Sequence, residues 1–196
     1  MMTSRSEYRL LLRQDNADQR LCPIGHRIGL VSGERLRAVE EKYAAVEQEV
    51  KRLAHTGVAG SGALNDLLAR RGTAPVADGA RLIDLLRRPQ VSYDDLRPFD
   101  PGAPALDKAV REQVEITVKY EGYIRRQQRQ VEEFEQLEKH ALPDDMDYSG
   151  IQGLRLEARE KLSAVRPLNL GQASRISGVS PADIGALMIW LQSRRG

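Results

Sequence analysis

The sequence contains little cysteine and few aromatic residues. Of its 196 residues only Cys22 is a cysteine, and aromatic residues make up 5% of the chain. A single cysteine excludes an internal disulfide, and a lone thiol is typical of proteins from a reducing compartment. No apolar run is long enough to span a membrane, and no signal-peptide pattern is present. We therefore expect a cytoplasmic protein with no membrane contact.

Residue groups that carry catalysis or bind metals are also missing from the sequence. Cysteine and histidine are never grouped at zinc-ligand spacing, and no glycine-rich phosphate loop follows a strand. His26 follows Cys22 by four residues, but on a helix this spacing is more often coincidence than a catalytic pair. We predict no catalytic residue, no metal site and no dinucleotide site in this chain.

The charges nearly cancel. The chain has 30 Lys and Arg against 28 Asp and Glu, for a net charge of +2. This balance does not by itself indicate a nucleic-acid binder, so any such surface would have to be a local basic patch. Hydrophobic residues make up 41% of the chain, which is enough for a packed core.

No proline lies between Pro104 and Pro143, and this stretch predicts a central helix over residues 105–140. Most of its residues are good helix formers. One predicted arc carries Val110, Val114, Thr117, Ile124 and Val131, and the arc beside it carries Ile116, Tyr120, Tyr123 and Phe134. Such a wide apolar face is suited to a helical bundle, so we expect Tyr120 and Tyr123 to be buried or partly buried.

The opposite side of this helix carries Lys119, Gly122, Arg126 and Arg129. A glycine inside a helix costs about 1 kcal/mol relative to alanine, and close approach of another backbone or of a ligand is the usual gain. The basic residues could contact nucleic acid, or they could pair with acidic neighbours. The spacing alone leaves both alternatives open.

The remaining pattern predicts an all-α protein. A second long helix spans residues 33–55 and follows Ser32 as its cap, and a flexible loop follows at 56–62. Its apolar residues form a stripe at spacings of three and four, at Leu36, Val39, Tyr43, Val46, Val50 and Leu53. Shorter helices are predicted at 15–21, 23–29, 64–71, 79–87, 93–96, 153–165, 170–177 and 181–192, with no strand of consequence after residue 14. Asp15, Asn169 and Ser180 are the expected N-caps of the first, seventh and eighth of these helices. The architecture is an elongated helical domain, 15–149, with two long helices, followed by a compact C-terminal three-helix bundle, 150–196. Gly178 lies in a tight turn between two helices, which is only a weak signal for a DNA-binding helix-turn-helix.

The first fourteen residues repeat arginine every four positions, at Arg5, Arg9 and Arg13, and Arg20 follows. These arginines could bind phosphates, or they could be an interface left by an absent domain. We expect residues 1–14 to be the remnant of a junction with such a domain.

Three segments carry a resemblance to one known family. They are residues 3–21 (TSRSEYRLLLRQDNADQRL), residues 119–124 (KYEGYI) and residues 166–182 (RPLNLGQASRISGVSPA). In sequence and in order, they resemble signatures of the C-terminal region of the MnmG family, also called GidA. The match extends over nearly the whole chain.

The resemblance implies a function that composition and spacing do not show. The family is the FAD-containing subunit of the tRNA wobble-uridine modification enzyme. With the GTPase MnmE it adds a carboxymethylaminomethyl or aminomethyl group at carbon 5 of that uridine, using FAD, NADH and methylenetetrahydrofolate. The resemblance also implies a homodimer and a C-terminal domain that binds tRNA and MnmE. The family's FAD-binding domain and catalytic cysteines are missing here, so we expect no cofactor and no activity in this chain alone.

The resemblance gives the residue patterns provisional roles. The predicted tRNA contacts are Arg5, Arg9, Arg13, Arg20, Lys119, Arg125, Arg126 and Arg129. The predicted MnmE contacts are Arg175, Ile184, Leu187 and Trp190. The predicted structural residues are Gly122, Tyr120, Tyr123 and Gly178. The alternative is a protein-interaction or dimer-supporting helical module that does not contact nucleic acid.

Overall fold

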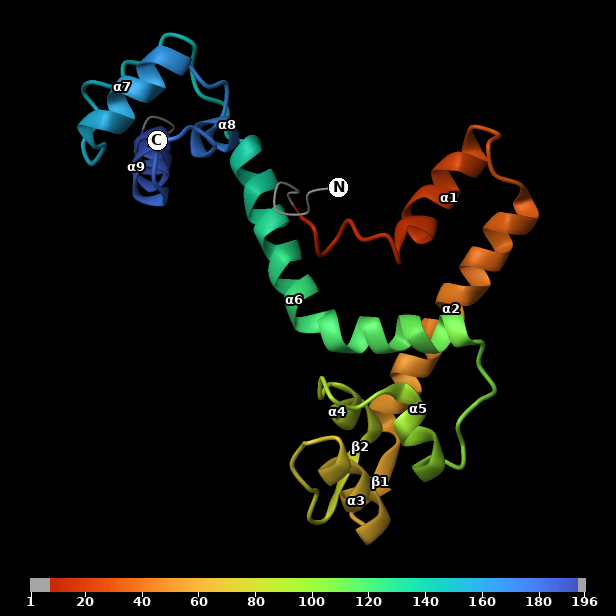
Figure 1. The fold of residues 1–196 in the computed structure, drawn as a ribbon. Helices are drawn as coiled ribbons and strands as arrows, with labels where there is room; N and C mark the ends of the chain where they lie inside the picture. The colour runs from red at the N-terminus through yellow and green to blue at the C-terminus, as the bar shows by residue number, and fades with distance from the viewer. Residues whose placement is uncertain (1–7, 194–196) are drawn as a thin grey trace. The chain divides into compact units, whose positions relative to one another are not determined.

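The computed structural model describes residues 8–193, and helices dominate this part of the chain (Figure 1). Two compact units, residues 1–125 and 126–196, each contain a hydrophobic core. The division falls inside the long helix α6, Lys108–Glu138, upstream of the boundary at 149/150 expected from the sequence. The all-α prediction is confirmed.

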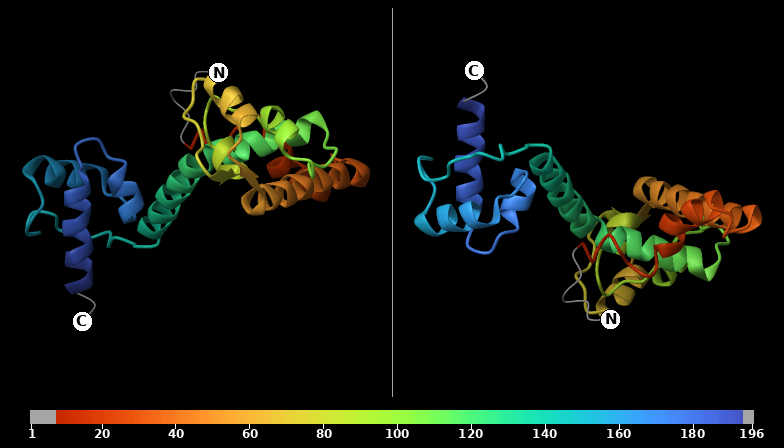
Figure 2. Two further views of the ribbon diagram at one scale, coloured as in Figure 1. Left: turned by 90° about the horizontal axis from the view of Figure 1, so that it is seen from below. Right: turned by 90° about the horizontal axis from the view of Figure 1, so that it is seen from above.

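The first unit is organised around α2, Gly33–His55, which packs against α1, Ala17–Arg27 (Figure 2). The Ser32 hydroxyl accepts a hydrogen bond from the Arg35 N–H and caps α2 as predicted. Val46 and Leu53 of the predicted stripe are buried in the first core. The sequence pattern therefore identified both the start and the inward face of this helix.

Short elements complete the first unit. They are β1 (Gly57–Ala59), α3 (Gly62–Arg70), β2 (Gly79–Arg81), α4 (Leu82–Leu86), α5 (Tyr93–Leu96) and the 3₁₀ helix η2 (Arg97–Phe99). Their buried side chains join those of α2 and α6 in the first core, which includes Leu64, Leu68, Leu82, Leu85, Leu86, Val91 and Leu96. Full burial of one such side chain stabilises the fold by about 1.5–3 kcal/mol.

The strands β1 and β2, of three residues each, are consistent with the prediction of no strand of consequence after residue 14, but they change where one helix begins. They pair antiparallel, with Val58 opposite Ala80. The predicted helix at 79–87 therefore begins three residues late, at Leu82. Gly79 has φ of +152°, a conformation that only glycine adopts readily and that cannot start a helix.

The N-terminal end of the first unit also differs from the prediction. The helices expected at 15–21 and 23–29 are one helix, α1, with Pro23 inside it. Proline removes one helical hydrogen bond, and the packing of α1 against α2 holds the helix together across it. Asn16 stands at the N-cap position in place of Asp15, because the Asp15 carboxylate binds the Arg13 side chain instead.

Helix α6 is buried only near its start. Val110, Gln113, Val114 and Val118 are buried, and no residue from 119 to 138 is. The prediction that Tyr120 and Tyr123 are buried or partly buried is wrong, since both are exposed, because the last α6 residue buried in the first core is Val118.

Gly122 lies in the exposed stretch of α6. A Cβ built on Gly122 would have no atom within 4 Å, apart from its chain neighbours and the helix's own backbone. Close packing within the described part of the chain therefore does not explain this glycine.

The second unit is the predicted three-helix arrangement. It consists of α7 (Leu156–Val165), α8 (Leu170–Ser174) and α9 (Pro181–Ser193). Asn169 caps α8, and Ser180 exchanges hydrogen bonds with Asp183 at the start of α9, as the sequence predicts. The core also includes the loop before α7, through Leu142, Met146, Tyr148, Ile151 and Leu154.

Two glycine substitutions should change stability in opposite directions. Gly122→Ala should raise the free energy of unfolding by about 0.5–1 kcal/mol, because alanine is the better helix former and has room here. Gly178→Ala should lower it by at least about 1–2 kcal/mol, because Gly178 has φ of +96° and its added Cβ would lie 2.7 Å from Glu157 Oε1. Urea denaturation followed by circular dichroism measures both. A destabilising Gly122→Ala would show that this glycine has a contact within the chain.

Candidate functional site

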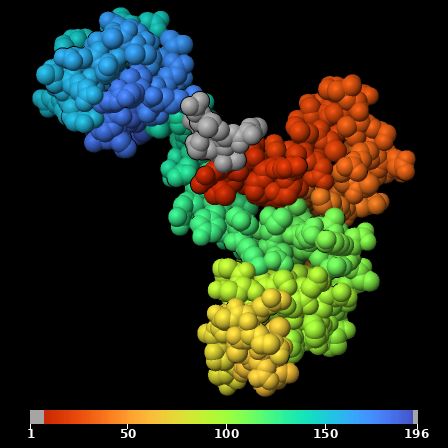
Figure 3. Space-filling view, viewed as in Figure 1, coloured from red at the N-terminus to blue at the C-terminus, as the bar shows by residue number. Residues whose placement is uncertain are grey.

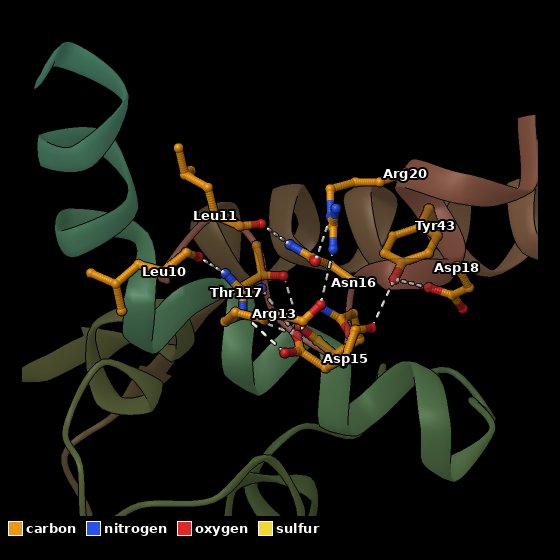
Figure 4. A network of polar contacts seen from close by, with 10 residues as sticks. Leu10, Leu11, Arg13, Asp15, Asn16, Asp18, Arg20, Tyr43 and Thr117 are labelled. Carbon is orange, nitrogen blue, oxygen red and sulfur yellow. Dashed lines mark hydrogen bonds and ion pairs between the residues drawn. The ribbon is translucent and has the colours of Figure 1, made fainter. Parts of the chain in front are cut away.

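A polar network fixes the segment that carries the first arginines (Figure 4). Arg13 Nε lies 3.0 Å from Asp15 Oδ1, and Arg13 Nη2 lies 3.0 Å from Asp15 Oδ2. Arg13 Nη1 donates to the Leu10 carbonyl, and the side chain is only 16% exposed. Residues 8–16 are turns rather than helix or strand, so the four-residue arginine spacing does not align these side chains. The guanidinium of Arg13 is occupied within the chain.

The same network extends to α1 and α2. Arg20 donates to Asn16 Oδ1 at 3.0 Å and to the Arg13 carbonyl at 3.3 Å. The Tyr43 hydroxyl donates to Asp18 Oδ1 at 2.7 Å, and burial together with this carboxylate raises the pKa of Tyr43. These contacts join the N-terminal segment to both helices.

The network also reaches α6. Burial acts to raise the pKa of Asp15, but hydrogen bonds from Arg13 and Gln113 outweigh it and lower that pKa overall. Gln113 belongs to α6, and Figure 3 shows residues 8–20 in red on the surface of the first unit. In this network Arg13 and Arg20 are held as structural residues.

The predicted basic residues of α6 differ in their exposure and in whether they already pair with a carboxylate. Lys119 is 18% exposed and holds Glu115 Oε1 at 2.7 Å and the Pro89 carbonyl at 3.2 Å. Arg125 is exposed and pairs with Glu121. Arg126 and Arg129 are exposed and form no ion pair with any residue between 8 and 193. Of the basic residues on α6, these two are the most available to a phosphate.

The other predicted nucleic-acid residues lie at the N-terminal end. Arg9 is exposed and makes no ion pair with the part of the chain that the structure describes. Arg5 falls outside the described residues. The structure does not bring Arg9 and Arg13 onto one helix face, as a regular helix would have done.

A buried ionic group was not foreseen from the sequence. Two nitrogens of Arg52, Nε and Nη2, donate to the two carboxylate oxygens of Glu49, each at 2.8 Å. Arg52 also donates to the carboxylate of Asp100. The Tyr93 hydroxyl donates to Glu49 Oε1 at 2.7 Å. One sequence signal was present, since Glu49 interrupts the apolar stripe of α2 between Val46 and Leu53, one turn before Arg52.

The predicted partner-binding residues of the second unit divide into surface and core. Ile184 and Leu187 are buried, so their side chains are not accessible to a partner in this fold. Trp190 is partly buried against the same core. Arg175 is exposed, lies 4.2 Å from the centre of the Phe134 ring, and reaches Glu138 at 3.5 Å.

Arg155 and Asp183 join the start of α7 to the start of α9. Arg155 Nη2 lies 2.7 Å from Asp183 Oδ2, and the Ser180 hydroxyl donates to the same oxygen. Asp183 is fully buried, and hydrogen bonds from Arg155 and Ser180 hold the pKa of its carboxyl far below the usual value. Gly178, in the predicted tight turn, accepts from Arg155 through its carbonyl.

The described residues do not fit a flavin or a metal centre. Their only strands are two three-residue antiparallel strands, with no parallel strand leading into a glycine-rich loop that could cradle FAD. Between residues 8 and 193, no group of three His, Cys, Asp or Glu side chains could hold a metal ion. The helices in this range are also too short or too polar to cross a membrane. The arrangement offers exposed cations for binding an anion.

Comparison with known proteins identifies two matching family models. The "tRNA modifying enzyme MnmG/GidA C-terminal helical domain" model matches residues 33–128, and the "tRNA modifying enzyme MnmG/GidA C-terminal helical bundle" model matches residues 130–196. The two ranges adjoin within α6, close to the division between the structural units.

Individual relatives agree with these models. The tRNA uridine 5-carboxymethylaminomethyl modification enzyme MnmG of Caldicellulosiruptor saccharolyticus is 52% identical over 197 residues, which is 100% of this chain and 32% of that protein. The Bacillus subtilis enzyme of the same name is 48% identical over 195 residues, or 31% of its length. A structure of Aquifex aeolicus GidA matches 95% of this chain and 29% of its own, with a TM-score of 0.63 at 36% identity. The chain thus spans about a third of the length of the curated relatives it matches.

Acid should weaken the second unit through Asp183. Because the folded-state pKa of Asp183 is lowered, its contribution is complete above the ordinary value of 3.8 and is lost as the pH falls below it. Asp183→Asn should lower the free energy of unfolding by about 2 kcal/mol at pH 7 by losing charge-assisted hydrogen bonds. In this variant the free energy of unfolding should also fall less steeply between pH 5 and 2 than it does in the original chain. Urea denaturation at both ends of this range tests the prediction, and an unchanged slope would contradict it.

Proposed function

The chain belongs to the C-terminal helical region of the MnmG/GidA family of tRNA-modifying enzymes, and we propose that it binds tRNA and the GTPase MnmE. The observation that carries the tRNA proposal is the pair Arg126 and Arg129, exposed on α6 without ion pairs in the described chain. In a longer protein, the parts outside this chain would hold FAD, NADH and methylenetetrahydrofolate, act on the wobble uridine and support a homodimer. By itself the chain would bind without catalysing.

The tRNA contacts we propose are a subset of those expected from the sequence. An arginine that already holds a carboxylate must give it up before it can bind a phosphate, whereas an exposed and unpaired arginine loses only water and mobility. Arg13 and Lys119 already hold carboxylates, and Arg20 already donates to the Asn16 amide oxygen and the Arg13 carbonyl. We therefore assign the main phosphate contacts to Arg9, Arg126 and Arg129, whereas Arg125 would first have to release Glu121.

An apolar stripe on α1 favours the second candidate function, a protein-interaction or dimer-supporting module. Leu21, Ile24 and Ile28 follow one another at spacings of three and four residues, and all three are exposed. Such a stripe is typical of a surface that another protein covers. A chain that bound no tRNA at low salt would favour this candidate.

The MnmE contact is proposed on the exposed side of the second unit. Ile184 and Leu187 would act indirectly, by holding α9 in place from the core. Direct contact would come from Arg175 and from Ile189, which is exposed on α9.

Charge reversal on α6 should weaken tRNA binding and change its salt dependence. In a chain carrying Arg126→Glu and Arg129→Glu, the slope of log K against log salt should become shallower by about 2, roughly one for each lost phosphate contact. Affinity at low salt should fall at least about tenfold. Gel mobility shift of a tRNA transcript across salt concentrations measures both quantities.

The matched control carries Arg70→Glu and Arg81→Glu, since these arginines are also exposed and the charge change is the same. This control should keep the original slope. Equal weakening by both variants would indicate a general charge effect and would argue against a track on α6.

Surface substitutions in the second unit should weaken MnmE binding. Arg175→Glu combined with Ile189→Asp should reduce affinity at least about tenfold, because one removes a charge contact and the other an apolar one. Calorimetric titration of purified MnmE into the chain measures this. Glu160→Lys, an exposed change on α7, serves as the control. Undiminished binding by the double variant would move the MnmE contact elsewhere.

A further inference from the structure

Tyr120 and Tyr123 are exposed to an extent that the fold does not require. Their exposed fractions are 43% and 59%, whereas Tyr93 and Tyr148 are buried in the two cores. Neither exposed hydroxyl takes part in a hydrogen bond with the residues that the structure describes. Two unburied aromatic rings on one helix leave a large apolar area in water, which is typical of a binding surface.

The two rings form one platform. They lie three residues apart on α6, with ring centres separated by 6.4 Å and planes inclined by 53°. Gly122 stands between them in the sequence, and the space where its side chain would be is open. At about 100° per residue, Gly122 lies about 160° around the helix from Tyr120, so this open space is not beside the rings, and the two rings alone form the surface.

The charges near the platform favour a polyanionic ligand. Arg126 follows Tyr123 by three residues on the same helix, is exposed and forms no ion pair with the described residues. Arg125 is also exposed, and Glu121 is already paired with Arg87 and Arg125. Aromatic rings interleaved with arginines are the usual means of holding unpaired bases, whose faces stack while their phosphates pair with cations.

We propose that an unpaired base of the bound tRNA stacks on one of the rings of Tyr120 and Tyr123 and meets the other ring with its edge. This inference rests on the proposed tRNA-binding function and deepens it, because phosphate contacts alone cannot distinguish paired from unpaired RNA. In a duplex the base faces are covered, so the platform selects a loop, a bulge or a splayed end.

Ring removal should weaken binding to tRNA without changing its salt dependence. The double variant Tyr120→Ala/Tyr123→Ala should bind a tRNA transcript about 5- to 150-fold more weakly, the range measured for loss of a stacked base. The slope of log K against log salt should be unchanged, because no phosphate contact is lost. The pair Tyr120→Phe/Tyr123→Phe keeps both rings and should bind within about twofold of the original chain.

Two controls test whether the effect requires an aromatic ring and an unpaired base. Leu30→Ala removes an exposed apolar side chain that has no ring and should leave tRNA affinity unchanged. A fully paired RNA duplex should bind the original chain and the double alanine variant equally. Circular dichroism confirms that each variant keeps its helices.

The outcomes distinguish this inference from the proposed function. If the original chain binds no tRNA, the proposed function and this inference both fail. If it binds tRNA and the alanine variant binds equally well, the tRNA function stands and the stacking platform is wrong. If the phenylalanine variant is as weak as the alanine variant, the hydroxyls rather than the rings make the contact, which also overturns the inference.

Discussion

Helix α6 contributes side chains to both hydrophobic cores. Between these two contacts it has no buried residue, so most of its surface there is exposed. Val110, Val114 and Val118 enter the first core, and Leu137 packs, partly buried, against the second. The helix between them has little tertiary packing to stabilise it. It depends on its own hydrogen bonds, on good helix formers and on pairs such as Glu115 with Lys119. The same lack of packing leaves its tyrosines and arginines available to a ligand.

Buried carboxylates hold together elements that are distant in sequence. Arg52 bridges Glu49 on its own helix and Asp100 after η2, and Asp183 binds the residue that precedes α7. Replacing such pairs with apolar residues can be neutral, but removing one partner leaves a charge buried and strongly destabilises the fold. These groups therefore select one arrangement of each unit, while the apolar cores provide most of the stability.

Much of the fold could be predicted from the sequence because local signals agreed with the tertiary contacts. The Ser32, Asn169 and Ser180 caps, the α2 stripe and the α5 boundaries needed only short-range information. The short strands could not be predicted, because they depend on pairing between residues twenty or more positions apart and on the backbone of Gly79.

The candidate site was harder to predict than the fold. Helical periodicity grouped Tyr120 and Tyr123 with the apolar residues but could not show where the first core ends. Spacing likewise could not show that Arg13 and Arg20 are held by the chain itself, whereas Arg126 is free of ion pairs in the described residues. The family resemblance gave the biological setting, and the structure separated residues that build the fold from residues that are exposed.

Trp190, the single tryptophan, packs against the core of the second unit. All indole fluorescence of the chain therefore originates in that unit, and the first unit contributes only tyrosine emission. Circular dichroism, by contrast, averages over the helices of both units. A comparison of the two spectroscopic signals during one titration would show whether the two cores melt as a single cooperative body or as independent ones.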